Sequence, residues 1–94
     1  MVIIYKDDFI EALARIREFI ALDSVSRADN FTKELRSKIE QIPFMPYRFR
    51  KNAILNDKNI RDLIFKGYVV SYKIDEKNQV IKILSIFKYN MPKF

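Results

Sequence analysis

Hydrophobic positions in the last third of the chain follow the two-residue repeat of β-strands. Three such segments, residues 60–65, 68–75 and 80–89, follow one another with short polar turns between them. Lys66-Gly67 fits a two-residue hairpin turn, and residues 76–79 fit a second tight connection. The pattern predicts a three-stranded antiparallel meander. Its register pairs Arg61 with Tyr72, Leu63 with Val70, Phe65 with Tyr68, Ile74 with Ile81, Tyr72 with Ile83, Val70 with Ser85 and Tyr68 with Phe87.

Side chains alternate across a strand, so the meander has two faces. One face is expected to form the core with the helices, and it carries Leu63, Phe65, Tyr68, Val70, Tyr72, Ile74, Ile81, Ile83 and Phe87, with Arg61 and Tyr89 near its edges. The other face carries Ile60, Asp62, Ile64, Val69, Ser71, Lys73, Lys82, Leu84, Ile86 and Lys88. Tyr72 is expected in the core, with its hydroxyl group at an edge.

The first half of the chain predicts a strand followed by two helices. Residues 2–5 form a short apolar run, and Asp8 with Glu11 has capping-box spacing at the start of the first helix. Polar residues 23–26 offer caps to the second helix, which Pro43 ends. The apolar stripes are Phe9, Leu13, Ile16 and Ile20 on the first helix and Ala28, Phe31, Leu35, Ile39 and Ile42 on the second. Because the connection is short, we expect an antiparallel helix hairpin on one sheet face.

Basic and aromatic residues interleave in residues 44–59, the irregular part of the chain. The run Tyr-Arg-Phe-Arg-Lys contains Arg48 and Arg50. Such a run can bind nucleic acid through phosphate contacts and base stacking. It also fits a loop whose aromatic residues anchor it to the core while its charges stay in water, and we favour this second interpretation.

The composition excludes several kinds of chemistry. The chain has 94 residues, no cysteine and no histidine, which excludes disulfides, thiol catalysis, imidazole acid–base chemistry and zinc sites of the usual ligand sets. We expect one domain over residues 1–94, with no metal and no cofactor. The net charge of +6 suggests an acidic partner, either nucleic acid or an acidic protein. Since we find no secretory signal and no apolar run of membrane-spanning length, we expect a cytoplasmic protein.

The second face of the meander is the candidate binding surface. A fully solvated face would carry more polar residues, and a second core face would not hold three lysines. An apolar strip rimmed by cations is typical of a groove for a partner segment; alternatively, the chain ends or the long loop cover it. The candidate contacts are Ile64, Val69, Ser71, Lys73, Lys82, Leu84, Ile86 and Lys88, together with Arg48, Arg50 and Arg61. A structural role for Arg61 at the sheet edge is favoured over target contact.

The order of strand, helix hairpin, basic loop and meander resembles the toxins of the RelE/ParE superfamily of bacterial toxin–antitoxin modules. In the second helix the resemblance rests on its apolar stripe, followed by Pro46 and Arg48. In the sheet it rests on Arg61-x-Leu63, on Tyr68-x-Val70-x-Tyr72-x-Ile74-Asp75 and on residues 80–86. It covers nearly the whole chain and implies an α+β fold with both helices packed on one face of the sheet.

The superfamily has two broad kinds of target, and the resemblance leaves both open. RelE-like members cut messenger RNA on the ribosome with arginines, lysines and often a C-terminal tyrosine, whereas ParE-like members poison DNA gyrase. This chain has Val69 and Phe87-Lys88-Tyr89 where the nucleases carry arginines. A nuclease would have to use Lys73, Lys82, Lys88 and Tyr89, and lysine clamps a phosphate less well than arginine. We therefore favour a gyrase-directed toxin of a plasmid-stabilisation module, with a nuclease or a degenerate toxin as alternatives.

The resemblance also implies an antitoxin that wraps the toxin with a helix or strand. Here it predicts an acidic, amphipathic segment docked on Ile64, Val69, Leu84 and Ile86, with its carboxylates near the lysines. On this interpretation Val69→Asp weakens antitoxin binding without unfolding the toxin. The tail, residues 90–94, is too short for a further helix, and we expect it to be disordered or to fold along the same face.

Overall fold

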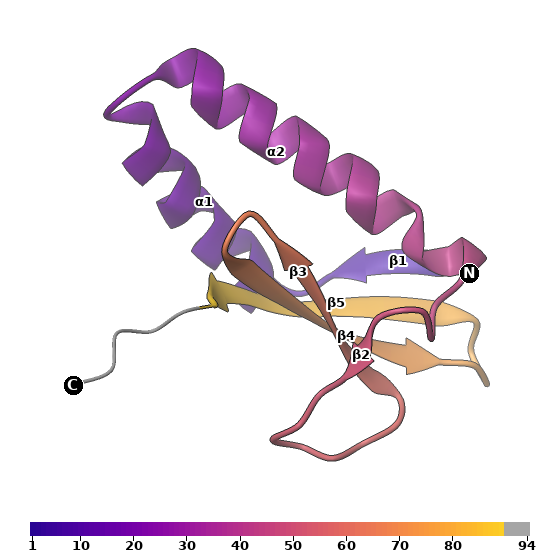
Figure 1. The fold of residues 1–94 in the computed structure, drawn as a ribbon. Helices are drawn as coiled ribbons and strands as arrows, with labels where there is room; N and C mark the ends of the chain where they lie inside the picture. The colour runs from indigo at the N-terminus through magenta and orange to yellow at the C-terminus, as the bar shows by residue number, and fades with distance from the viewer. Residues whose placement is uncertain (90–94) are drawn as a thin grey trace.

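The computed structural model describes residues 1–89, which form two helices on one face of a five-stranded sheet (Figure 1). The elements in chain order are β1 (Val2–Tyr5), α1 (Asp7–Ala21), α2 (Val25–Glu40), the short 3-10 helix η1 (Ile42–Phe44), β2 (Arg50–Lys51), β3 (Ile60–Phe65), β4 (Tyr68–Asp75) and β5 (Val80–Lys88). The predicted α+β fold is confirmed. The tail at residues 90–94, expected to be disordered or folded along the sheet, lies outside the described residues.

The sheet has the strand order β1-β5-β4-β3-β2 and is mixed rather than purely antiparallel. The predicted meander forms its centre, and Lys66 and Gly67 turn between β3 and β4 with φ angles of 48° and 84°. Two positive φ angles in a two-residue loop match the twist of antiparallel strands. The sequence did not predict two pairings: β1 runs parallel to β5, and β2 adds a short antiparallel edge next to β3.

Each of the two α-helices starts directly after a residue whose backbone is extended. Ser24 has this conformation at the start of α2, and its hydroxyl oxygen accepts a hydrogen bond of 3.1 Å from the Arg27 amide. At the start of α1 the extended residue is Lys6, whose side chain caps nothing. The predicted capping box of Asp8 and Glu11 is therefore wrong, since both residues lie inside the helix.

The core fills the space between the helix hairpin and the sheet. It contains Ala28, Phe31, Leu35 and Ile39 of α2, Ile42 of η1, and Leu63, Phe65, Val70, Tyr72, Ile74, Ile81 and Ile83 from the meander. The prediction that the second helix continues through Ile42 to Pro43 is wrong, because α2 ends at Glu40 and both residues lie in η1. Phe9 is the buried residue of α1, and Leu13, Ile16 and Ile20 pack against the core while keeping some exposure. Neither helix within residues 1–89 is long and apolar enough to cross a membrane.

A β-bulge in β5 shifts the register of its second half. Ser71 pairs with Ser85 while Tyr72 pairs with Ile83, so Leu84 is left without a register partner. One extra residue on one strand reverses the alternation of side chains beyond it. The observed pairs are Val70 with Ile86, Val69 with Phe87 and Tyr68 with Lys88, so the predicted pairs of Val70 with Ser85 and of Tyr68 with Phe87 are wrong.

Four predicted face assignments change because of this bulge, and one of them is Tyr89, which was expected near the edge of the core face but lies on the face away from the helices, with its ring beside Arg50. Ile86, expected on the second face, is 4% exposed and belongs to the core. Lys88 was also expected on the second face, but it lies on the helix side, with its Nζ 5.0 Å from the ring centroid of Tyr68. Phe87, expected in the core, instead lies on the face away from the helices and is 45% exposed.

Tyr72 occupies the predicted place, buried in the core with its hydroxyl donating to the Pro46 carbonyl at 2.7 Å. Burial penalises the phenolate and raises the pKa of Tyr72 far above its ordinary value of about 10. In the unfolded chain Tyr72 ionises at its ordinary pKa, whereas in the folded protein it stays neutral to a higher pH. The folded state therefore keeps its full stability below the ordinary pKa and loses stability as the pH rises above that value.

We expect Tyr72→Phe to lower the free energy of unfolding by about 1–2 kcal/mol at neutral pH, because the Pro46 carbonyl loses its donor. The wild-type protein should lose stability above about pH 10, and the variant should lose less of it over the same range. Urea unfolding at neutral and alkaline pH checks both expectations. An equally steep alkaline loss in the variant would contradict them.

Candidate functional site

The face of the sheet away from the helices, called the open face here, includes three neighbouring rows of side chains that carry the predicted contacts, and a fourth row of Asp75, Val80 and Val2 next to the first of them. Each row joins register partners on neighbouring strands. The three rows are Ile4, Lys82, Lys73 and Ile60; then Ser85, Ser71, Asp62 and Arg50; then Phe87, Val69 and Ile64. The three rows differ in chemistry: the first holds two lysines, the second holds polar groups and the third is apolar.

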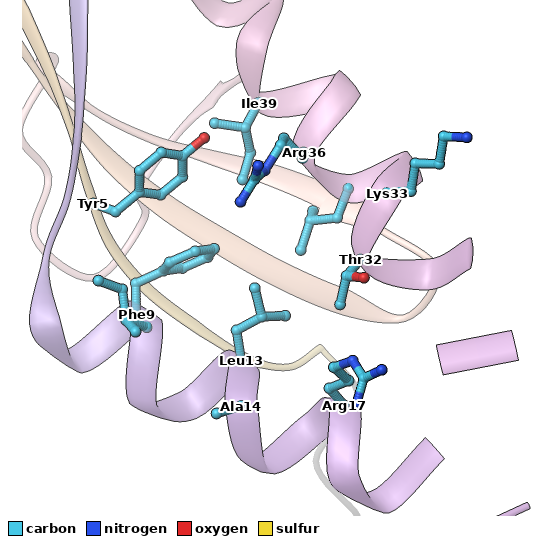
Figure 2. A pocket seen from close by; sticks show the side chains of 11 residues that line it. Tyr5, Phe9, Leu13, Ala14, Arg17, Thr32, Lys33, Arg36 and Ile39 are labelled. Carbon is cyan, nitrogen blue, oxygen red and sulfur yellow. The ribbon is translucent and has the colours of Figure 1, made fainter. Parts of the chain in front are cut away.

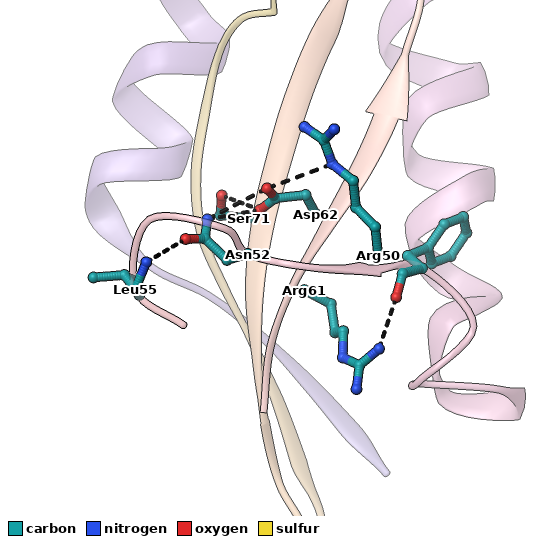
Figure 3. Close-up of polar contacts among 7 residues, drawn as sticks. Arg50, Asn52, Leu55, Arg61, Asp62 and Ser71 are labelled. Carbon is teal, nitrogen blue, oxygen red and sulfur yellow. Dashed lines mark hydrogen bonds and ion pairs between the residues drawn. The ribbon is translucent and has the colours of Figure 1, made fainter. Parts of the chain in front are cut away.

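The middle row is closed by a polar cluster under the chain that follows β2 (Figure 3). The Asn52 amide nitrogen donates to both carboxylate oxygens of Asp62, at 3.1 and 3.3 Å, and the Ser71 hydroxyl donates to one of them at 2.8 Å. Arg50 adds an ion pair, with its Nε 3.8 Å from the same carboxylate. All of these groups except Arg50 are buried. Coverage by the long loop, one of the two alternatives for this face, therefore applies to the middle row, and Ser71 is not available as a contact.

The apolar row remains partly accessible, although its composition differs from the prediction. Phe87 takes the place expected for Ile86, and Phe87 and Ile64 are each a little under half exposed. Val69 lies between them in register and is only 2% exposed. Val69→Asp would put a charge into this buried position, so the expectation that this variant stays folded is withdrawn.

Tyr89 extends the apolar row beyond the end of β5. Its backbone amide donates to the Gly67 carbonyl at 2.7 Å, and the guanidinium of Arg50 lies 5.2 Å from the centroid of its ring. Such cation–π contacts are worth about 0.5–1 kcal/mol at exposed sites. At this end of the open face the accessible apolar surface is therefore formed by Ile64, Phe87 and Tyr89, and Arg50 borders it.

The residues considered for RNA cleavage do not come together. Lys73 and Lys82 are register partners on the open face, two rows away from the row that Tyr89 extends. Lys88 lies on the other face, over Tyr68, whose ring packs edge-on against Phe31 of α2. The four candidates are thus divided between two faces and, on the open face, between rows that the buried polar row separates. Leu84, predicted as a contact, is the half-buried bulge residue.

Arg61 holds the loop before β2 against the sheet. Its guanidinium donates to the backbone carbonyls of Lys58, Phe49 and Tyr47 at 2.9, 3.1 and 3.3 Å. The structure gives Arg61 the structural role that was favoured, while target contact remains untested. Arg48 lies over the ring of Phe49, which packs against the core. The loop is therefore anchored by an aromatic residue, as favoured for residues 44–59.

A second accessible surface lies between the two helices (Figure 2). It is a groove of about 690 Å³ whose apolar lining includes Phe9, Leu13 and Leu35. Arg17, Lys33 and Arg36 also line it, and Tyr5 closes it at the β1 end. Burial raises the pKa of Tyr5, with smaller opposing effects of Arg36 and Glu40. The sequence contained a signal that was missed, since Ile10 and Ala14 line the groove and lie outside the core stripe of α1.

The comparisons with known proteins agree with this architecture. The family model described as the ParE toxin of the type II toxin–antitoxin system, parDE, matches residues 3–91. The chain belongs to the ParE toxin family. A solved chain from a chromosomal ParDE toxin–antitoxin system of P. aeruginosa superposes on this ParE-family toxin with a TM-score of 0.79 at 13% sequence identity. The match covers 96% of this chain and 97% of that chain. The search of curated proteins finds no match.

The buried polar cluster is the part of this ParE-family toxin that sequence reasoning missed. The register predicted from the Lys66-Gly67 turn already places Asp62 opposite Ser71, which the structure confirms. A carboxylate and a hydroxyl group facing each other in the middle of a strand pair suggest a hydrogen bond. The third partner, Asn52, comes from a loop with no periodic pattern, and for that reason the sequence could not identify it.

Proposed function

We propose that this ParE-family toxin acts on DNA gyrase by binding it, without catalysing a reaction of its own. The observation that carries this proposal is the separation of the candidate nuclease residues. Lys88 faces the helices, and the row of Lys73 and Lys82 is two register rows away from the row that Tyr89 extends. Phosphodiester cleavage needs a proton acceptor, a proton donor and cations around one phosphate. The observed placement favours the gyrase-directed branch of the superfamily over the nuclease branch.

We further propose that an acidic antitoxin segment neutralises the toxin by docking on the open face. Ile64, Phe87 and Tyr89 offer apolar contact area, and the adjoining Arg50 can pair with a carboxylate. The net charge of +6 would speed association with an acidic partner, whereas apolar burial would supply most of the affinity. The groove between the helices has similar chemistry, so a segment that wraps the toxin could continue into it.

Two matched substitutions separate these antitoxin surfaces. Phe87 on the open face and Ile10 beside the helix groove are both about half exposed, so Phe87→Asp and Ile10→Asp should each leave the fold intact. We expect Phe87→Asp to weaken binding of the cognate antitoxin at least about tenfold. Calorimetric titration of both variants with the antitoxin measures how much of the binding free energy each surface contributes. Unchanged affinity in Phe87→Asp, with a loss in Ile10→Asp, would move the antitoxin to the helix groove.

Expression in bacterial cells tests the proposed activity. Growth arrest with induced DNA damage and intact transcripts supports gyrase as the target. Transcripts cut at codon positions, with undamaged DNA, would replace the proposal with the nuclease alternative. Antitoxin binding without growth arrest would identify a degenerate toxin.

A further inference from the structure

The loop between β2 and β3 presents two adjacent aliphatic side chains to solvent. Ile54 is 89% exposed and Leu55 is 59% exposed. Burial of such a side chain stabilises a protein by roughly 1.5–3 kcal/mol. In Figure 1 this loop projects from the sheet on the side away from the helices. Single exposed apolar residues are ordinary, but two exposed neighbours in a projecting loop form an apolar knob.

Hydrogen bonds on both sides hold this knob in one shape. At the start of the loop, the Asn52 side chain accepts from the Leu55 amide at 2.8 Å, and the Asn52 carbonyl accepts from the Asn56 amide at 3.1 Å. At its end, the Asp57 carboxylate accepts from the Asn59 amide at 2.8 Å, and the Asp57 carbonyl accepts from the Ile60 amide at 3.0 Å. The loop therefore needs little further ordering before it binds, which reduces the entropic cost of binding.

The same asparagine ties the knob to the sheet. Its amide nitrogen donates to the buried carboxylate of Asp62, while its amide oxygen fixes the turn that carries Leu55 (Figure 3). A buried polar cluster gives little net stability compared with an apolar one of the same volume, but it fixes geometry. Its effect here is to hold an exposed loop at a set position beside the open face.

The charges around the knob are mostly positive. Arg50, Lys51 and Lys58 flank it and are exposed, and the carboxylate of Asp57 is engaged within the loop. Proteins that bind duplex DNA tightly make roughly six to ten phosphate contacts, more than three cations can supply. Two aliphatic side chains also lack the flat faces on which bases stack. A protein surface with an apolar pocket and a carboxylate rim matches this chemistry better than nucleic acid does.

We infer that Ile54 and Leu55 form the contact with the protein that the toxin acts on, inserted into an apolar pocket rimmed by carboxylates. This inference rests on the proposed function. It also gives the antitoxin a way to neutralise the toxin, since the cluster that holds the loop lies one register row from Phe87 and Ile64. A segment docked on those residues would lie beside the knob and hinder access to it.

The test compares the wild type with Ile54→Ser/Leu55→Ser and with Leu22→Ser. Leu22 is 86% exposed, close to the value for Ile54, and lies in the helix hairpin at the other end of the molecule from the loop. Growth arrest is scored as colonies formed after induction. We expect the double variant to restore colony formation at least about tenfold while Leu22→Ser arrests growth like the wild type. Ile54→Val/Leu55→Met, which keeps the knob apolar, should also arrest growth. Thermal melting and antitoxin affinity should be the same in all four proteins, because the substituted side chains are exposed.

Each other outcome overturns the inference in a distinguishable way. If Ile54→Ser/Leu55→Ser arrests growth as fully as the wild type, the proposed function still holds but the knob does not contact the target. A wild type that does not arrest growth removes the proposed function and the inference with it. Binding to a short DNA duplex at physiological salt is measured in parallel. If the double variant loses affinity for the duplex by the same factor as it loses toxicity, the knob binds DNA, and the inference that it binds a protein is wrong.

Discussion

Replacing Ile86 with aspartate is expected to unfold the protein. Ile86 lies in the core because of the bulge at Leu84, and it pairs with Val70, which is fully buried. An unpaired carboxylate at such a position costs on the order of 4 kcal/mol or more, in addition to the lost packing. A domain of this size has a free energy of unfolding of about 5–15 kcal/mol. Circular dichroism should therefore report a variant that is mostly unfolded or that melts far below the wild type.

The same substitution one residue further along gives the matched control. Phe87 is on the open face and half exposed, so Phe87→Asp should change the free energy of unfolding by less than about 1 kcal/mol. Regular alternation without a bulge would put Phe87 in the core and Ile86 on the open face, so Phe87→Asp would then be the more destabilising of the two substitutions. If Phe87→Asp unfolds the protein and Ile86→Asp does not, the register of the second half of β5 is wrong.

The second large effect is expected at Asp62. In Asp62→Ala the buried Asn52 amide and the Ser71 hydroxyl lose their acceptor, and Arg50 loses its ion-pair partner. Leaving buried donors unsatisfied should cost about 2–4 kcal/mol. The amide of Leu55 should also exchange its hydrogen faster, since the Asn52 side chain that accepts from it is no longer held. Chemical denaturation and hydrogen exchange measure the two effects.

An exposed ion pair controls for simple loss of charge. Glu34 accepts from the Lys66 ammonium at 3.0 Å, and both side chains are about half exposed. Glu34→Ala should cost less than about 1 kcal/mol, because water screens such pairs. Equal losses in Asp62→Ala and Glu34→Ala, with unchanged exchange at Leu55, would mean that the buried cluster does not hold the loop.

The sequence predicted those parts of the fold that depend on local patterns. The meander follows from alternation and from the turn at Lys66-Gly67, and the helix hairpin follows from two stripes at helical spacing. The parallel pairing of β1 with β5 joins segments from opposite ends of the chain, and no local pattern specifies it. The strand β2 has only two residues, which is too short to show any period.

The bulge left a signal in the sequence that regular alternation obscured. The isoleucines step by two from Ile81 to Ile83 and then by three to Ile86, with Ser85 where regular alternation would require a core residue. A change from a two-residue to a three-residue step is what one extra residue in a strand produces. Because every residue after the bulge changes face, this single irregularity misplaced Ile86, Phe87, Lys88 and Tyr89.

The candidate surface was predicted in kind but not in detail. An apolar row and two lysines do lie on the open face, because the residues before the bulge keep their predicted register. The sequence could not show that the middle row is closed, since that closure depends on how residues 50–55 cross the sheet. Nor could it show that Arg50 reaches Tyr89, a contact between residues far apart in the chain.

The most direct test of gyrase as the target uses purified DNA gyrase, supercoiled plasmid DNA and the purified toxin. We expect linear plasmid DNA to accumulate only when toxin and gyrase are both present, and to disappear when the cognate antitoxin is added. Absence of gyrase-dependent cleavage, together with cut messenger RNA in reactions that contain ribosomes, would contradict the proposed function.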